Sequence, residues 1–422
     1  MSDEILAIAG KQFYMLGPGI LDLSRDLRDK VKFSFIKESY HTVVSEVTRV
    51  PTGENRFQRL LSICSSLTEP TMIFCSSPAS ASKVAKELIR NKIGIQSPWL
   101  NDATRWISQH YRQEWHFPIA LRNGIGVHHG RIPRALSQYI VRQFNEERLR
   151  FLVCTSTLIE GVNTKAKNII VFDNKIAQKE IDLFTFNNIQ GRAGRMFQHF
   201  VGRVFIFYDP PQSDLPLVDV PAFSQDAPPT LLMQIDENDL TEKSQSKLFR
   251  YKNQDLLAYE TLRANVGVDP DAQLALAETI SSNLREFHPL LNWSYYPDTN
   301  QLRTICKLIW DHFRGLELGN RSVWTPAQLS FLVSMLSARR TTRELIQSQI
   351  EFLRGRSAEV DIDDVVQRIL DFLRLWANHH FPRLLRALDR IQRDIFTSNG
   401  LSAGNYETFA TSVENFFLDP TT

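Results

Sequence analysis

The fold of this chain is decided by residues Arg150 to Met196, which read RFLVCTSTLIEGVNTKAKNIIVFDNKIAQKEIDLFTFNNIQGRAGRM. Two short apolar runs within it, Phe151–Cys154 and Ile169–Phe172, have the length and the β-branched or aromatic content of buried strands. A helical pattern follows and ends at the glycine-rich run 191–195. Strands that alternate with helices indicate a parallel sheet with helices on its faces, and such sheets bind ligands where polar clusters follow the strands.

The glycine-rich run carries two arginines, Arg192 and Arg195, three positions apart. Such a pair can present two guanidinium forks from one helical turn, and the neighbouring glycines let a phosphate approach closely. This chemistry suits the charge on a transferring phosphoryl group. An arginine pair on a solvated helix face is the alternative, and the run alone does not decide between the two.

Length and composition indicate a soluble globular protein of two or three domains. The chain has 422 residues, of which 43% are hydrophobic and 23% are charged. The net charge is only +2, so nucleic-acid binding would need a local basic patch. No apolar run approaches the length of a membrane span, and the N-terminus lacks the layout of a signal peptide. We expect a cytoplasmic protein with no membrane partner and with reduced thiols at Cys64, Cys75, Cys154 and Cys306.

The remaining pattern predicts a sheet-forming half and a helical half. Apolar and β-branched runs predict further strands at 32–36, 42–50, 71–75, 124–129 and 201–207. Helical patterns predict helices between them at 57–65, 77–89 and 134–144. Six prolines between residues 210 and 229 indicate a linker or a surface loop. Beyond residue 231 the pattern is almost wholly helical, with helices expected at 248–265, 272–287, 300–313, 325–336, 341–353, 361–376 and 382–396.

Four segments occur in the order and at the spacing of helicase motifs. They are 71–77 (TMIFCSS), 127–130 (VHHG), 155–163 (TSTLIEGVN) and 188–195 (NIQGRAGR). They resemble, in turn, motif IV, the nucleic-acid-facing motif that follows it, motif V and motif VI. The chain therefore resembles the C-terminal half of a superfamily 2 helicase of the Ski type, similar to the bacterial DEAD/DEAH-box helicases found among anti-phage defence genes.

The resemblance implies an α/β fold, in which a RecA-like parallel sheet with flanking helices precedes a mostly α-helical C-terminal region. Residues 1–31 would connect from a missing first RecA-like domain, and residues 32–209 would form the second one. Residues 210–230 would be a Pro-rich linker, and residues 231–422 the helical region. A winged-helix module is an alternative for the first of these helices.

The sequence lacks the parts that hold ATP in this family. It contains no Gly-x-x-x-x-Gly-Lys-Ser/Thr run for the phosphates, and no Asp-Glu-x-His or Asp-Glu-x-Asp run at a strand end for Mg²⁺. In the family, both belong to the first RecA-like domain. The resemblance thus implies that ATP and Mg²⁺ are bound jointly with a Walker-motif RecA-like domain, either in the same full-length protein or in a partner subunit.

The resemblance also assigns roles to single residues. Arg192 and Arg195 match the arginine fingers that reach the γ-phosphate, which is a catalytic role. Asn188 departs from the family, which usually has Gln three residues before the glycine of motif VI, and Asn is one methylene shorter. The residues that match ATP-binding and coupling positions are Gly161, Asn163, Asn188 and Gly191.

Hydroxyls, histidines and a glycine match the family's nucleic-acid contacts. They are Ser76, Ser77, His128, His129, Gly130, Thr155, Ser156 and Thr157. The adjacent histidines also raise a metal-site hypothesis. Neighbouring residues of a strand point to opposite faces and rarely share one ion, so we expect no metal site.

Aromatic and arginine patterns offer two further hypotheses. The tryptophans Trp99, Trp106 and Trp115 could stack bases, although their helical spacing favours core packing. One side of the helix at 382–396 carries an arginine stripe, which could track a phosphate backbone. A solvated face paired with Asp389 and Asp394 is favoured slightly for its members, Arg383, Arg386, Arg390 and Arg393.

Three function classes remain open. The leading one is the C-terminal motor half of an ATP-dependent helicase that acts on single-stranded DNA or RNA. This half is not expected to hydrolyse ATP alone, because the Walker motifs are absent. The second is a non-catalytic nucleic-acid-binding or regulatory subunit of a defence complex, in which the arginine pair would have no use. The third is an assembly protein that docks through its helical half, residues 231–422.

Overall fold

The computed structural model describes the chain in segments: residues 22–23, 44–50, 55–158, 164, 166–176, 179–193, 201–211, 217–218, 227–313, 322–355 and 359–418. The strand predicted at 32–36 lies outside these residues, as do most of the predicted connector 1–31 and most of the predicted linker 210–230. The domain boundaries drawn from the sequence therefore stay predictions.

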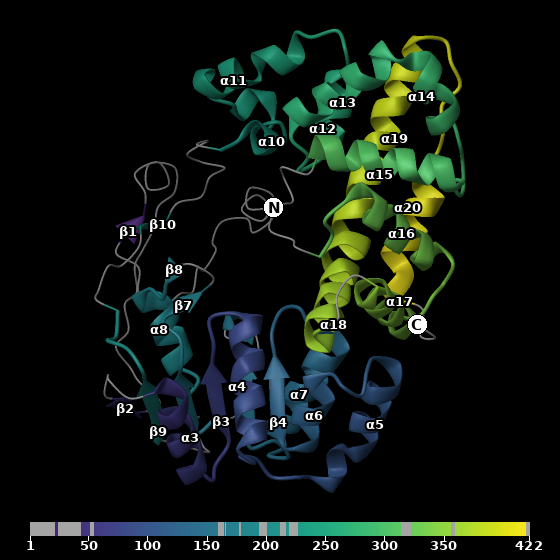
Figure 1. The fold of residues 1–422 in the computed structure, drawn as a ribbon. Coiled ribbons are helices and arrows are strands. Elements are labelled where there is room, and N and C mark those ends of the chain that lie inside the picture. Colours follow the sequence, from purple (N-terminus) through teal and green to yellow (C-terminus); the bar gives the residue numbers. More distant parts are fainter. Residues whose placement is uncertain are drawn as a thin grey trace.

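A parallel sheet of six strands, in the order β2-β9-β6-β3-β5-β4, forms the centre of the N-terminal half (Figure 1). Each strand agrees with a predicted one to within two residues. The four strands β3 to β6 are buried along their whole length, which explains their predominantly apolar sequence. The bounds are Val44–Arg49 (β2), Thr71–Phe74 (β3), Ile125–His128 (β4), Phe151–Cys154 (β5), Asn168–Val171 (β6) and Val201–Ile206 (β9).

Two short strand pairs lie outside the main sheet. The strands β1 (Asp22–Leu23) and β10 (Leu217–Val218) pair in parallel. The antiparallel hairpin of β7 (Lys175–Ile176) and β8 (Lys179–Glu180) follows β6. Neither pair was predictable from the sequence, because strands of two residues are too short to show a period.

The register of the sheet aligns the carboxyl ends of three adjacent strands, β3, β5 and β4. Cys154 is the partner of Phe74 on one side and of His128 on the other. The alignment continues past the strands, because the Cys75 amide donates to the Cys154 carbonyl at 2.8 Å and the Thr155 amide donates to the His128 carbonyl at 3.2 Å. The segments that follow β3, β4 and β5 therefore leave the sheet side by side.

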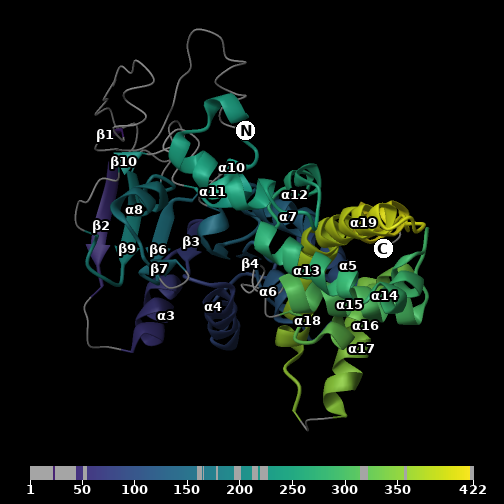
Figure 2. The same ribbon diagram turned by 90° about the horizontal axis from the view of Figure 1, so that it is seen from above.

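Helices cover both faces of this sheet. Figure 2 shows α3 and α4 on one face and α8 on the other. The helix α4 begins after Ser77, whose side chain accepts a hydrogen bond from the Ser80 amide, and Pro78 occupies the first helical position, where its missing N–H costs nothing. The bounds are Arg56–Ser66 (α3), Pro78–Arg90 (α4), Asn101–His110 (α5), His116–Arg122 (α6), Arg134–Asn145 (α7) and Leu183–Gln190 (α8).

The C-terminal region is helical, as predicted (Figure 1). Among the described residues after Val218, the β structure is a single isolated bridge between Ser294 and Asn405, and no wing hairpin occurs. The α-helices are Pro229–Leu232 (α10), Glu242–Lys252 (α11), Tyr259–Ala264 (α12), Pro270–Ser282 (α13), Leu284–Leu291 (α14), Thr299–Phe313 (α15), Pro326–Ser337 (α16), Thr342–Arg354 (α17), Ile362–Asp371 (α18), Phe381–Ser398 (α19) and Glu407–Glu414 (α20).

Two predicted helices are wrong in extent. The helix predicted at 248–265 is divided into α11 and α12, because the Gln254 side chain accepts hydrogen bonds from the amides of Leu256 and Leu257 and so competes with the helical pattern. The helix predicted at 272–287 breaks at Asn283, whose φ of −133° is not helical, and continues as α14.

A predicted break between two other helices does not occur. The π-helix η5 (Phe372–His380) joins α18 to α19, and the joining residues Phe372 and Phe381 keep right-handed helical angles. The ring of Pro382 would clash with the carbonyl four residues earlier in an ideal α-helix. The wider turns of η5 immediately before it accommodate that ring, so one continuous helix runs from Ile362 to Ser398.

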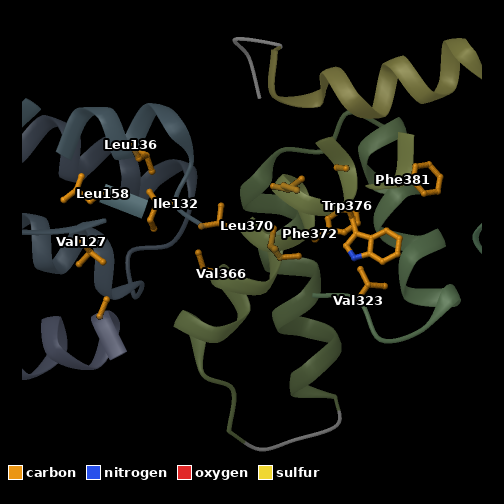
Figure 3. Packing of buried hydrophobic residues seen from close by; sticks show 14 of the residues in the cluster. Val127, Ile132, Leu136, Leu158, Val323, Val366, Leu370, Phe372, Trp376 and Phe381 are labelled. Carbon is orange, nitrogen blue, oxygen red and sulfur yellow. The ribbon is translucent and has the colours of Figure 1, made fainter. Parts of the chain in front are cut away.

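This long helix connects the cores of the two halves. Figure 3 shows Val366 and Leu370 of α18 at the junction, with Ile132 on the sheet side and Phe372 and Trp376 on the helical side. All five side chains are buried in one hydrophobic cluster. Burying a side chain such as Leu370 contributes about 1.5–3 kcal/mol, so this contact stabilises a defined arrangement of the two halves. Within the described residues, no helix has the length and apolar character needed to cross a membrane.

Candidate functional site

Three of the helicase-like motifs converge at the carboxyl edge of the sheet. Ser76 follows β3, His129 and Gly130 follow β4, and Thr155 follows β5. The backbone hydrogen bonds between these segments hold them side by side. This edge is where parallel sheets bind ligands, so the fold assembles residues that are up to 80 positions apart in the sequence.

The two serines of motif IV already have partners within the chain. Both the amide and the hydroxyl of Ser76 donate to Asp173 Oδ2, at 2.9 and 3.0 Å. The Ser77 hydroxyl accepts from the Ser80 amide at 3.2 Å and caps α4. Burial tends to raise the pKa of Asp173, but hydrogen bonds from Ser76, Ser80 and Arg56 outweigh it and hold the pKa below its ordinary value. None of the motifs pointed to Asp173, although an acid two residues after β6 is a visible signal in the sequence.

The adjacent histidines are neutral parts of the core. Their exposed fractions are 7% for His128 and 2% for His129. Burial lowers the pKa of His128 to about 4 and that of His129 to about 3, so neither carries charge at neutral pH. His129 Nδ1 accepts from the Arg131 amide at 3.3 Å. His129 therefore helps to hold the loop after β4 through this hydrogen bond, and His128 ends the strand.

Gly130 lies between motif V and the helical region. A Cβ atom there would approach Arg374 Nη1 and Thr157 Cγ2 at 3.0 Å each, which is tighter than ordinary packing. Thr155 is buried, and its hydroxyl lies 3.3 Å from that of Thr157. The exposed Arg374 comes from η5, more than 200 residues away, so no local pattern could have placed it here.

Motif VI is carried by α8, which begins after the cap Asp182. Asn188 and Arg192 are half-buried, whereas Gly191 at the end of the helix is exposed. The Arg192 amide donates to the Ile189 carbonyl at 3.1 Å and continues the last turn. The remaining predicted residues of this group, Gly161, Asn163 and Arg195, lie outside the described residues.

Tight packing fixes Ala193 of this motif against the sheet. Ala193 forms an isolated bridge with Ala166, and its carbonyl carbon lies 2.5 Å from where a Cβ of Gly202 would be. Only a glycine in β9 permits this approach. The two groups of predicted residues therefore occupy different parts of the sheet: the nucleic-acid group follows β3, β4 and β5, whereas Ala193 lies against the start of β9.

The arginine stripe of α19 is paired within the helical region. Arg386 contacts Glu407 and Glu414 at 2.8–3.1 Å, and Arg393 pairs with Asp389 at 2.9 Å. Arg390 donates to Asn265 at 2.9 Å, and Arg383 donates to the Gly267 carbonyl at 3.4 Å. These contacts favour the paired face over a phosphate track. Asp394, which was expected to pair with these arginines, instead accepts a hydrogen bond from the Ala258 amide.

The tryptophan expectation is correct for only one of three residues. Trp115 is buried, but Trp99 is 74% exposed and Trp106 is 48% exposed. The Trp106 ring stacks on His110 with centroids 4.1 Å apart. Core packing was therefore the wrong interpretation for Trp99, in the 3-10 turn before α5, and for Trp106 of α5, because both rings are presented to solvent.

Comparison with known proteins indicates the class of domain that the sheet forms. Residues 121–197 match the helicase conserved C-terminal domain family, and this range includes the loop after β4, motif V and motif VI. The chain thus contains a helicase C-terminal domain with a RecA-like fold, followed by a helical region. Among solved structures, Dbp5 of S. cerevisiae bound to RNA and ADP BeF3 is 16% identical with a TM-score of 0.30, covering 40% of this chain and 37% of that one.

The particular relatives include anti-phage proteins. The chain is 32% identical to anti-bacteriophage protein B of Escherichia coli K12, over 97% of this chain and 58% of that protein. It is 26% identical to Hachiman protein HamB of Bacillus cereus, over 31% of this chain and 12% of that protein. These matches confirm the resemblance read from the motifs, and the chain spans little more than half the length of the first relative.

Proposed function

We propose that this chain is the C-terminal motor half of an ATP-dependent DNA or RNA helicase. The observation that carries the proposal is the convergence of three helicase-like motifs at one edge of the sheet, with a fourth held against β9. A first RecA-like domain with Walker motifs would complete the ATP site. In support, the chain is 30% identical to the ATP-dependent DNA helicase Hel308 of Pyrococcus horikoshii, over 21% of this chain and 13% of that protein.

The residues of motif VI fit one side of a phosphate site. Arg192 is half-buried at the end of α8, and the exposed Gly191 leaves the backbone accessible. With Arg195, Arg192 would hold the γ-phosphate from this side, while the first RecA-like domain would supply the phosphate cradle and the Mg²⁺ ligands. Bound ATP supplies the phosphoryl group whose hydrolysis releases free energy. Gly161, Asn163 and Asn188 would couple that site to the nucleic acid.

The carboxyl edge of the sheet would hold the sugar-phosphate backbone of a single strand. Backbone amides of the loop after β4 and hydroxyls of motif V are suitable donors to phosphate oxygens. The half-exposed Arg131 and the exposed Arg374 add positive charge beside Gly130. Contacts of this kind depend on charge and shape, so we expect binding to weaken steeply as salt rises.

Replacing the arginine finger tests the proposal. In the complete motor, Arg192→Ala and Arg195→Ala should each lower nucleic-acid-stimulated ATP turnover about 10³- to 10⁵-fold. Each substitution removes a guanidinium that would stabilise the charge of the transition state. Binding of an oligonucleotide should stay close to wild type. Arg105→Ala, at an exposed arginine of α5, is the matched control and should keep full turnover. Near-normal turnover in both finger variants would rule out the assignment.

We also propose that the whole protein acts in defence against phage, because the relative that is similar over almost all of this chain is named an anti-bacteriophage protein. Cells that carry the natural gene should restrict phage plating, and the Arg192→Ala variant should lose that protection if defence depends on the motor. Protection that survives this substitution would instead favour a non-catalytic subunit that binds nucleic acid without ATP turnover.

A further inference from the structure

One face of α18 lies against the domain that carries the predicted nucleic-acid loop. Asp363, Gln367 and Asp371 follow one another at intervals of four on this face. Asp371 Oδ2 pairs with Arg131 Nη1 at 3.1 Å, and Gln367 donates to Asp371 Oδ1 at 3.1 Å. Asp371 is only 8% exposed, so its carboxylate is committed to these partners and is not a solvated surface charge.

The partner of Asp371 is part of the loop after β4. The Arg131 amide donates to His129 Nδ1 at 3.3 Å, and the Ile132 amide donates to the His129 carbonyl at 3.0 Å. Three residues beyond Asp371, Arg374 lies against Gly130. The same helix therefore holds this loop at two successive positions, through an ion pair at Arg131 and through packing at Gly130.

We propose that Asp371 is a positioning residue for the nucleic-acid site: its carboxylate holds Arg131 and thereby fixes the backbone of His129 and Gly130 where a phosphate backbone would lie. The inference rests on the proposed nucleic-acid role of this loop. It goes further by assigning part of the site's geometry to the helical region, through a contact between residues 240 positions apart.

Two substitutions that change the charge of α18 equally can test this role of Asp371. Asp371→Asn and Asp364→Asn each remove one negative charge from the same helix, and the Asp364 side chain, which is 52% exposed, pairs with Arg368 and not with Arg131 among its described contacts. Electrostatic attraction alone predicts slightly tighter oligonucleotide binding in both variants. Positioning predicts the opposite sign for Asp371→Asn, with binding weaker by roughly two- to 150-fold, the range that coupling between residues in contact usually spans.

A pH profile distinguishes positioning from a general structural role. Burial raises the pKa of Asp371 to about 6, while Arg131 and Arg374 lower it and Asp364 raises it. The neighbouring His129 stays neutral over this range, because its pKa is about 3. Wild-type binding should therefore fall towards that of Asp371→Asn as pH drops from 7.5 to 5, where both side chains are uncharged. The ratio of their dissociation constants should be largest above pH 6.

The experiment uses the full protein and a fluorescent single-stranded oligonucleotide, with amide hydrogen exchange of residues 129–132 measured in parallel. Faster loop exchange and weaker binding in Asp371→Asn, with Asp364→Asn unchanged or slightly tighter, support the inference. Equal behaviour of the two variants overturns it. If the wild type binds no oligonucleotide, the proposed function fails separately, and the exchange of the loop still decides whether Asp371 positions it.

Discussion

At the scale of single residues, the closest packing in the candidate site is between Gly202 and motif VI. A Cβ at position 202 would lie 2.5 Å from the Ala193 carbonyl carbon and 2.7 Å from its oxygen. Backbone atoms cannot move aside as the end of a long side chain can, so any larger residue must displace Ala193 and with it Arg192. Gly202 therefore fixes the end of motif VI without touching a ligand.

We expect Gly202→Ala to lower the free energy of unfolding by about 1–3 kcal/mol through overpacking. The same displacement of Arg192 should reduce ATP turnover in the complete motor. Denaturant unfolding and a turnover assay check both parts. Gly355→Ala is the matched control, because the nearest atom to its added Cβ lies 3.6 Å away, at ordinary contact distance. Equal unfolding free energies for the two variants would contradict the packing argument.

At the scale of elements, a polar cluster ties together the amino ends of three strands. Glu69 precedes β3, and its carboxylate pairs with Lys167 at 2.6 Å and with Arg203 at 3.1 Å. Asn168 accepts from Arg203 and donates to Thr71, at 3.0 and 3.2 Å. The hydrogen bond from Lys167 is the main cause that lowers the pKa of Glu69 to about 2. The cluster thus aligns β3, β6 and β9 at the end opposite the nucleic-acid loops.

Glu69→Gln tests this cluster through pH. The folded pKa lies below the ordinary value, so the ionised carboxylate stabilises the fold above about pH 4.5, and this stabilisation is lost as pH falls towards 2. We expect wild type to be more stable than Glu69→Gln at pH 7, with a difference that shrinks below pH 4. Unfolding curves across this range provide the measurement. Glu260→Gln, at an exposed residue of α12, should match wild type at every pH.

At the scale of the whole molecule, Asp363 joins the two halves. The first residue of α6, His116, donates its amide to Asp363 Oδ1 at 2.7 Å, and the helix has no side-chain cap of its own. Lys86 of α4 pairs with the same carboxylate. A residue 247 positions away therefore caps α6 and fixes α18 on the sheet domain, beside the shared apolar contact of Val366 and Leu370.

We expect Asp363→Ala to cost about 1–3 kcal/mol, because it leaves a buried amide and an ammonium without their acceptor. Amide exchange should become faster at the start of α6 and along α18. Asp364→Ala is the control, since its exposed pair with Arg368 contributes only about 0.3–0.5 kcal/mol. An Asp363→Ala variant no less stable than this control would show that Asp363 contributes nothing to joining the halves.

Much of the fold was predictable because its strands and helices are encoded locally. Runs such as Phe151–Cys154 are apolar at every position because both faces of the strand are covered. The predicted helix bounds are wrong where a side chain competes with the backbone for hydrogen bonds, as at Gln254. They are also wrong where wider helical turns accommodate a proline, as at Pro382. Exposure of Trp99 and Trp106 was also missed, since periodicity shows that a helix has a face but not whether anything covers it.

The sequence by itself determined the order of strands and helices, the helicase-like motifs and the class of protein, because each depends on residues near one another in the chain. The tertiary structure alone decided that Ser76 donates hydrogen bonds to Asp173 and that Ser77 caps α4. It likewise decided that the histidines are buried and neutral. It also decided that Asp363, Asp371 and Arg374 meet the sheet domain. Contacts of this kind depend on how two apolar faces pack across more than 200 residues, and no local period records that.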